Sequence, residues 1–378
     1  MYGKDWLGEF TSEFDEDYYT DVSEKEEFPE KFWQSLGERS KFGLLVSKKN
    51  GGSGISFTEF VKNILDMSSK VGTLTYYFVA QNLSAKLFDD YGTQKLKSFL
   101  PEVMTGKSKV NLALAEEQSG ADALSIRTRA TPAENGDYEI SGEKYCVTNG
   151  KNADYLMVAA RTSDSGEKKS HGLTVFVITR KQPDRIKFKE LKKMGLNFLP
   201  LYSISFDRII IDRESILGEP DRAWSMLSKT FAADRLALSA MFIGMGNMAL
   251  SRALDYARKR VVFGREIGAN QGIQFPLSKA YVELSASRAY LEHSARMVDG
   301  GGIESNRDLP MGVYYHAVRA SSSAIDASLQ TLGASGYLSG MVEKLFRDIR
   351  YYRMGPISEQ LALVSIAEKT LGLPGVRE

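Results

Sequence analysis

The apolar residues of this chain change their spacing twice, and this change constrains the fold more than any other feature. Over residues 27–104 they recur at helical spacing, as in residues 60–65. Residues 110–217 hold short β-branched or apolar runs separated by turn sequences such as Asn149-Gly150. Helical spacing returns over residues 223–371. Helices, then strands, then helices do not follow the alternating βαβ order of a doubly wound sheet.

This order predicts an α+β protein of three domains. We expect a helical N-terminal domain at residues 1–108, a middle β domain at residues 109–217 and a C-terminal helical bundle at residues 218–378. Several short strands at such spacing are typical of a β-barrel or sandwich. A length of 378 residues is compatible with two to three domains.

Composition and charge exclude several classes of protein. A net charge of +1 argues against a general nucleic-acid-binding protein. One cysteine cannot form an intrachain disulfide, and together with three scattered histidines it offers no zinc-site spacing. The most apolar stretch, residues 236–250, is too short for a membrane span. The acidic N-terminus lacks the pattern of a signal peptide, so we expect a cytoplasmic protein.

Two further patterns are interpreted as structural. Residues 1–30 hold eleven acidic residues and two lysines, and we expect a solvated, partly frayed segment there. Residues 244–249 match a dinucleotide-binding fingerprint, Gly-x-Gly-x-x-Ala. That fingerprint requires a preceding strand, whereas these residues lie inside a helical stretch. We therefore expect their small side chains to allow close packing of helices.

Four segments combine glycines, hydroxyls and arginines at the ends of expected strands and helices. They are Leu112–Asp122, Lys144–Gly150, Arg260–Arg265 with the nearby Gln271, and Gln330–Gly333. In this order, over most of the chain, they resemble the acyl-CoA dehydrogenases. The resemblance implies FAD as cofactor, an acyl-CoA substrate and an electron-transferring flavoprotein as electron acceptor. It also implies a homodimer or homotetramer that holds the cofactor across a subunit interface.

The resemblance assigns FAD contacts to positions in all four segments and in one further helix. They are Leu112, Leu114, Ala115, Gly120, Ala121, Cys146, Thr148, Arg260, Phe263, Gln271, Gln330, Gly333, Ser358 and Gln360.

Four of these positions depart from the family pattern, and the first is Leu112, where the family often has Tyr or Phe. Ala115 and Ala121 lack the hydroxyls that the family often has there, so backbone N–H groups must carry more of the flavin binding. Cys146 stands where the family usually has Trp or Phe. Its structural alternative is a small buried apolar residue.

The resemblance also locates the catalytic base. Many members place a glutamate where this chain has Pro356, which cannot accept a proton. Another branch, which includes isovaleryl- and long-chain-type enzymes, places the base just before an arginine, and this chain reads Asp234-Arg235 there. We predict Asp234 as the base, because a carboxylate among apolar residues has a raised pKa. Glu359 is the alternative base, and Asp234 as a helix cap or an ion-pair partner is the structural alternative.

We expect FAD-dependent oxidation of an acyl-CoA to the trans-2-enoyl-CoA, with Ala121 and Arg235 contacting the substrate. Two alternatives remain open. One is a carrier-protein-bound acyl oxidase or a flavin monooxygenase on the same scaffold. The other is a flavin- or acyl-CoA-binding protein without catalysis, in which Pro356 marks the lost activity.

Overall fold

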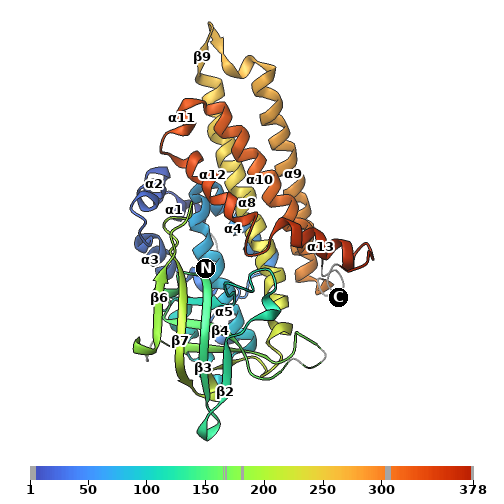
Figure 1. The fold of residues 1–378 in the computed structure, drawn as a ribbon. Coiled ribbons are helices and arrows are strands. Elements are labelled where there is room, and N and C mark those ends of the chain that lie inside the picture. Colours follow the sequence, from blue (N-terminus) through green and yellow to red (C-terminus); the bar gives the residue numbers. More distant parts are fainter. Residues whose placement is uncertain (1–5, 165, 167, 180–182, 303–307, 376–378) are drawn as a thin grey trace.

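The computed structural model describes residues 6–164, 166, 168–179, 183–302 and 308–375. Helices precede a β-sheet, and a second set of helices follows it (Figure 1). This confirms the predicted α+β class and its order of elements. The boundaries of the three domains stay a prediction.

Seven helices form the N-terminal region. They are α1 (Trp6–Thr11), α2 (Glu16–Glu24), α3 (Glu30–Glu38), α4 (Phe57–Val71), α5 (Thr75–Tyr91), α6 (Gln94–Lys97) and α7 (Leu100–Met104). The longest of them, α5, is buried along most of its length and lies between the sheet and the other helices.

The acidic start of the chain is not frayed over its described part. Helices α1 and α2 bury Phe10, Phe14 and Tyr19 in the helical core, with at most 1% of each side chain exposed. The acidic residues between them face solvent, and Asp15 caps α2 by accepting a hydrogen bond from the Tyr18 N–H. The expectation was wrong because these aromatic residues, interspersed among the acidic ones, anchor both helices in the core.

Eight strands form one mixed sheet in the middle region. They are β1 (Val110–Ala113), β2 (Arg129–Pro132), β3 (Tyr138–Thr148), β4 (Tyr155–Arg161), β5 (Leu173–Thr179), β6 (Ile186–Glu190), β7 (Leu201–Ile211) and β8 (Ile216–Leu217). The strand order is β6-β7-β3-β2-β4-β5-β8, and β1 pairs with β4 in parallel. Residues of the edge strands β6 and β8 share one apolar cluster with the central strands, so the sheet curls around its own core.

Strand β4 shows how the sheet separates two cores. Leu156, Val158 and Ala160 join the core inside the sheet. Tyr155 and Met157 point the other way and pack with residues of α5 and α7. Because side chains alternate along a strand, a run buried on both faces reads as continuously apolar.

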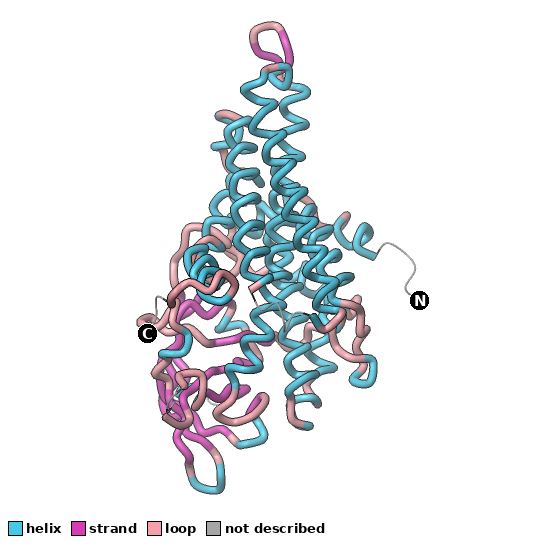
Figure 2. Tube along the Cα trace, turned by 90° about the vertical axis from the view of Figure 1, so that its right-hand side faces the viewer, coloured by secondary structure: helices cyan, strands magenta, loops and turns pink. Residues whose placement is uncertain are grey.

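The C-terminal region is a bundle of long helices. Its elements are α8 (Ala223–Lys259), the hairpin strands β9 (Val261–Val262) and β10 (Arg265–Glu266), α9 (Gln271–Asp299), α10 (Leu309–Leu332), α11 (Ala334–Tyr337), α12 (Met341–Tyr352) and α13 (Glu359–Lys369). Figure 2 shows the hairpin at the far end of the bundle from the sheet.

The glycines of the fingerprint-like motif lie inside α8, as expected. A methyl group on Gly244 would lie 1.8 Å from the Ser68 Oγ of α4, and one on Gly246 would lie 2.7 Å from Leu284 of α9. Both glycines therefore let neighbouring helices approach α8 closely, and the dinucleotide-fingerprint interpretation stays rejected.

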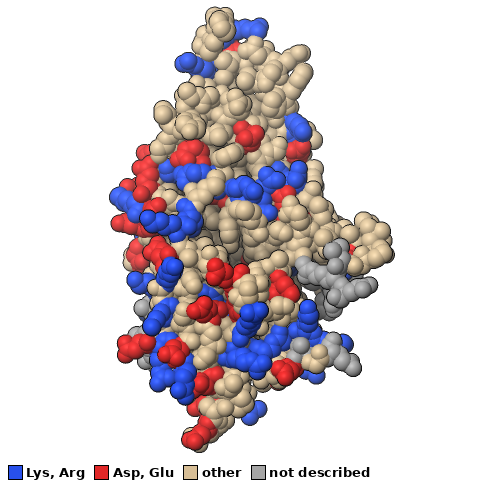
Figure 3. Space-filling model, in the orientation of Figure 1, with Lys and Arg blue, Asp and Glu red and all other residues tan. Residues whose placement is uncertain are grey.

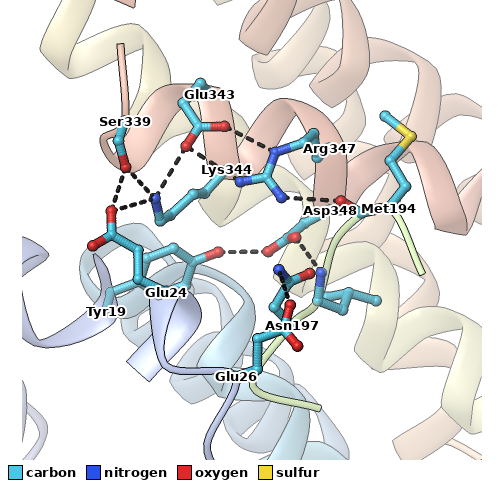
Figure 4. A network of polar contacts seen from close by, with 11 residues as sticks. Tyr19, Glu24, Glu26, Met194, Asn197, Ser339, Glu343, Lys344, Arg347 and Asp348 are labelled. Carbon is cyan, nitrogen blue, oxygen red and sulfur yellow. Dashed lines mark hydrogen bonds and ion pairs between the residues drawn. The ribbon is translucent and has the colours of Figure 1, made fainter. Parts of the chain in front are cut away.

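A polar network joins the two helical regions and the β region (Figure 4). The buried Asp348 of α12 accepts hydrogen bonds from the Tyr19 hydroxyl (2.5 Å), the Thr73 hydroxyl (2.6 Å) and the Leu196 N–H. On the same helix, Arg347 donates to the carbonyl of Met194 (3.0 Å). The network fixes α12 against α2 and the β6–β7 connection, and the end of α12 reaches the candidate site. In the described residues, no helix is long and apolar enough to cross a membrane.

Candidate active site

Asp234 lies on α8 where the bundle meets the sheet. Its side chain is partly exposed, and its carboxylate forms no hydrogen bond or ion pair with any described residue. Burial raises the pKa of Asp234 to about 6, although the charge of the neighbouring Arg235 opposes the shift. Removal from water disfavours the charged carboxylate, which explains the direction. Asp234 is therefore a carboxylate that can change protonation state near neutral pH.

Tyrosines from both helical regions lie close enough to Asp234 to be affected by its charge. Tyr76 comes from α5, Tyr314 from α10 and Tyr351 from α12. After burial, the charge of Asp234 is among the largest causes that raise the pKa of each tyrosine. The nearby Thr148 hydroxyl, at the end of β3, has a smaller opposite effect and lowers the pKa of Tyr76. These phenols stay neutral at physiological pH.

Cys146 borders the same region in an unusual backbone conformation. Its φ angle is 57°, in the left-handed region, and it lies in a β-bulge where the pairing of β3 with β7 shifts between Lys144 and Val147. Such a conformation costs on the order of 1–3 kcal/mol and collects at functional sites. The thiol is partly exposed, and burial raises its pKa, so it remains protonated.

A buried ion pair holds the loop that follows β1. The Lys144 ammonium is fully buried and donates to the Glu116 carboxylate (2.8 Å) and to the Leu114 carbonyl (2.9 Å). Glu116 also accepts hydrogen bonds from the backbone N–H groups of Arg127 (2.6 Å) and Thr128 (2.9 Å). The ion pair and these hydrogen bonds therefore hold together the two ends of the loop that runs from Ala115 to Arg127.

The residues expected in this loop face different environments. Leu112 and Leu114 are partly buried and pack on the core beneath the sheet, as do Trp224 and Phe231 of α8. Ala115 is partly buried, whereas Gly120 and Ala121 are exposed. The solvent-exposed part of the loop at Gly120 and Ala121 thus consists of backbone and one small side chain.

Glu359 is committed to ion pairs. Its carboxylate, 4% exposed, pairs with the guanidinium groups of Arg353 and Arg319, the latter at 3.1 Å. Burial alone would raise the pKa of Glu359, but these two arginines outweigh it and hold the pKa below its usual value. A carboxylate held by two guanidinium groups is a poor proton acceptor, which disfavours Glu359 as the alternative base.

Ser358 and Gln360 line a shallow pocket beside this ion pair. The pocket also contains Arg350, Arg353 and Met354. The Ser358 hydroxyl caps α13 by accepting from the Leu361 N–H (3.1 Å), and it keeps its own proton available for a ligand.

The other expected FAD contacts lie at the opposite end of the bundle. Arg260, Phe263, Gln271, Gln330 and Gly333 are all exposed, and the Phe263 ring is in full contact with solvent. Arg260 follows Asp234 along α8 by 26 positions, or about 39 Å at 1.5 Å per residue. Figure 3 shows few charged side chains on this end of the bundle. The structure thus separates the expected contacts into two sets that one dinucleotide on one chain cannot join.

Three tyrosines of the site were not expected from the sequence. Tyr76 and Tyr314 are far from Asp234 along the chain, and no local pattern connects them. Tyr351 directly precedes the buried Tyr352 on α12, and no sequence pattern distinguishes which of the two faces the site.

Comparison with known proteins identifies the family. The acyl-CoA dehydrogenase N-terminal, middle and C-terminal domain profiles match residues 4–107, 111–209 and 221–370. The chain belongs to the acyl-CoA dehydrogenase family. The resemblance seen in the sequence is thereby confirmed, and the chain is placed among the FAD-dependent oxidoreductases of that family.

Relatives cover nearly the whole chain of this family member. An acyl-CoA dehydrogenase of Bacillus subtilis is 29% identical over 358 residues, which span 93% of each chain. A mitochondrial isovaleryl-CoA dehydrogenase of rice is 29% identical over 89% of this chain and 82% of its own. A glutaryl-CoA dehydrogenase of Mycobacterium smegmatis, solved in complex with FADH2, shares the fold with a TM-score of 0.90, at 19% identity over 98% of this chain and 94% of that one.

The residues of this acyl-CoA dehydrogenase family member fit a flavin dinucleotide in chemistry. The guanidinium of Arg260 and the amides of Gln271 and Gln330 are donors suited to phosphate and adenine groups. Gly333 has a φ angle of 60°, and a Cβ there would meet nothing within 4 Å, which leaves room for a ligand. In the loop after β1, the buried Ser119 hydroxyl has no partner among the described residues.

Proposed function

We propose that the chain oxidises an acyl-CoA between its α and β carbons, with Asp234 as the base that removes the α-proton. The observation that carries this proposal is the uncommitted carboxylate of Asp234. Three other buried carboxylates near the site, Glu116, Asp348 and Glu359, each hold several hydrogen bonds or ion pairs. Asp234 is thus suited to exchange a proton with a ligand.

The chemistry requires a base that is ionised at working pH and basic enough to attack a C–H bond. A carboxyl group with a pKa of about 6 meets both conditions near pH 7. Asp234 takes the α-proton, and Ala121 and Arg235 are the proposed substrate contacts. When bound, FAD supplies the acceptor for the hydride that leaves the β-carbon.

We propose that two chains build each FAD site. The set Leu112, Leu114, Ala115, Gly120, Ala121, Cys146, Thr148, Ser358 and Gln360 would hold the cofactor near Asp234. The set Arg260, Phe263, Gln271, Gln330 and Gly333 would hold the dinucleotide half bound to a neighbouring chain. The 39 Å estimated along α8 between the base and Arg260 supports this division. Exposed apolar side chains near the second set, including Val261, Tyr337 and Leu338, support a homodimer or homotetramer.

Two further assignments complete the proposal. An electron-transferring flavoprotein is the proposed acceptor of the electrons, and the cytoplasm is the proposed compartment. Both rest on the family and the sequence composition.

An Asp234→Asn variant tests the base. Asparagine keeps the size of the side chain but cannot accept the proton, so we expect FAD to stay bound while its reduction by an acyl-CoA slows about 10²- to 10⁴-fold. The measurement is anaerobic bleaching of the flavin absorbance over a panel of acyl-CoAs. Asp326→Asn, an exposed carboxylate on α10, is the matched control.

Each outcome discriminates between the alternatives. Unimpaired bleaching in Asp234→Asn would remove Asp234 as the base. Bleaching followed by rapid reoxidation in air would favour an oxidase or monooxygenase. A yellow wild-type protein that no acyl thioester bleaches would favour a binding protein.

A further inference from the structure

Tyr351 lies at the end of α12 and packs at the edge of the helical core, where it is partly buried. Its neighbour Tyr352 is 1% exposed and packs in the helical core, whereas Tyr351 is partly buried. The two rings are 5.2 Å apart at an angle of 73°. The phenol of Tyr351 folds over Gly355, where a Cβ would lie 3.3 Å from its hydroxyl oxygen. Because Gly355 has no side chain, the phenol of Tyr351 can occupy this space.

The hydroxyl of Tyr351 is uncommitted, unlike that of Tyr314, which donates to the carbonyl of Tyr352 (2.6 Å). For Tyr351, no hydrogen-bond partner exists in the described chain. Burial first, and then the nearby Cys146 and Asp234, raise its pKa to about 12. The group is therefore a protonated donor located near both the base and the strand end that carries Thr148.

Proton removal from a thioester creates a need for such a donor. As Asp234 takes the α-proton, the C–H electron pair moves into the bond to the carbonyl carbon, and negative charge gathers on the carbonyl oxygen. A preorganised donor at that oxygen stabilises the charge and lowers the barrier.

We propose that Tyr351 donates a hydrogen bond to the thioester carbonyl oxygen of the bound substrate. The hydroxyl keeps its proton throughout, so the base and the donor have separate tasks. This assignment makes Tyr351 a catalytic residue, and it rests on the proposed function of Asp234.

Exchange of α-hydrogens tests this donor separately from oxidation. Acetyl-CoA has α-hydrogens but no β-carbon, so it can be deprotonated and reprotonated but not dehydrogenated. We expect the FAD-loaded wild-type enzyme to exchange its α-hydrogens for deuterium in D2O, followed by NMR. In Tyr351→Phe, which loses one oxygen atom, exchange should slow about 100-fold, the usual effect of removing one such donor. The FAD content and the lower limb of the pH profile should stay unchanged, and the affinity for acetyl-CoA should fall much less than the exchange rate, because the hydrogen bond strengthens as charge develops on the oxygen.

Control variants separate the two proposals. Tyr138→Phe removes the hydroxyl of a partly buried tyrosine at the far end of β3 and should exchange like the wild type. Wild-type exchange in Tyr351→Phe would overturn the role of Tyr351 while leaving Asp234 intact. Loss of exchange together with FAD or with the fold would assign Tyr351 a structural role and would also overturn the proposal. An inactive wild type would instead contradict the proposed function, and Tyr351 with it.

Discussion

The buried pair of Glu116 and Lys144 permits a quantitative prediction for Glu116→Gln. The ammonium of Lys144 is 0% exposed, and Glu116 is its one charged partner among the described residues. Burial lowers the pKa of Lys144 to about 8, although Glu116 opposes this shift. Glutamine removes the opposing charge, so the pKa of the lysine should fall further. Buried lysines without a partner reach values of about 5–6.

The expected cost of Glu116→Gln depends on pH. In the unfolded chain the lysine has a pKa near 10.4. Where the native lysine has already lost its proton, the free energy of unfolding therefore rises with pH, by about 1.36 kcal/mol per pH unit. In the wild type this gain begins above pH 8, where Lys144 loses its proton. In Glu116→Gln it begins at a lower pH. When the pH is lowered from 8 to 6.5, the free energy of unfolding of the variant should therefore fall about 2 kcal/mol more than that of the wild type. This loss adds to a cost of the substitution that does not depend on pH.

Urea unfolding at pH 6.5 and pH 9, followed by tryptophan fluorescence, measures this difference. Asp164→Asn is the matched control, because its pair with Arg129 is solvent-exposed and should contribute less than about 1 kcal/mol at either pH. A destabilisation by Glu116→Gln that is equal at the two pH values would refute the reasoning. It would show that Lys144 is not held as a buried cation.

Two further predictions concern the proposed active site and its partner chain. Because a base must be unprotonated, the rate of flavin reduction by an acyl-CoA should rise through pH 6, the pKa of Asp234, and level off by about pH 7; a profile that is flat between pH 5 and 7 would contradict the assignment. Phe263 is fully exposed within one chain, so Phe263→Ser should leave the stability of the isolated chain unchanged. It should also weaken subunit association and FAD retention about 10- to 100-fold, as expected when a phenyl group is no longer buried. Light scattering and the ratio of FAD to protein test this, and wild-type values for both would count against a shared site.

The order of elements could be predicted because each region repeats one apolar spacing many times. Strand β4 illustrates this, since its unbroken apolar run follows directly from burial on both faces. The place of Gly244 inside a helix was predictable for the same reason. The acidic start was misjudged because its charge conceals a regular pattern: Trp6, Phe10, Phe14 and Tyr18 recur every four residues, and Phe10 and Phe14 join the helical core.

The composition of the candidate site was predictable only in part. Asp234 stands out in sequence as a lone acid in an apolar helix, and the structure shows why, since its carboxylate meets no partner in the described chain. Tyr76, Tyr314 and Tyr351 approach it from three helices far apart in sequence, and only the packing of those helices brings them together. The role of Glu359 likewise depended on Arg319 and Arg353, which no spacing rule connects to it.

The continuous helical core has a consequence for synthesis on the ribosome. One apolar cluster extends from Leu7 to Ile357, so the first helices bury their faces against helices that are translated near the end of the chain. At 5–20 residues per second, the segment between α7 and the end of α12 takes roughly 12–50 s to make. During that interval the aromatic faces of α1 to α4 lack their final partners. The nascent chain therefore passes through a long period in which chaperones have apolar surface to bind.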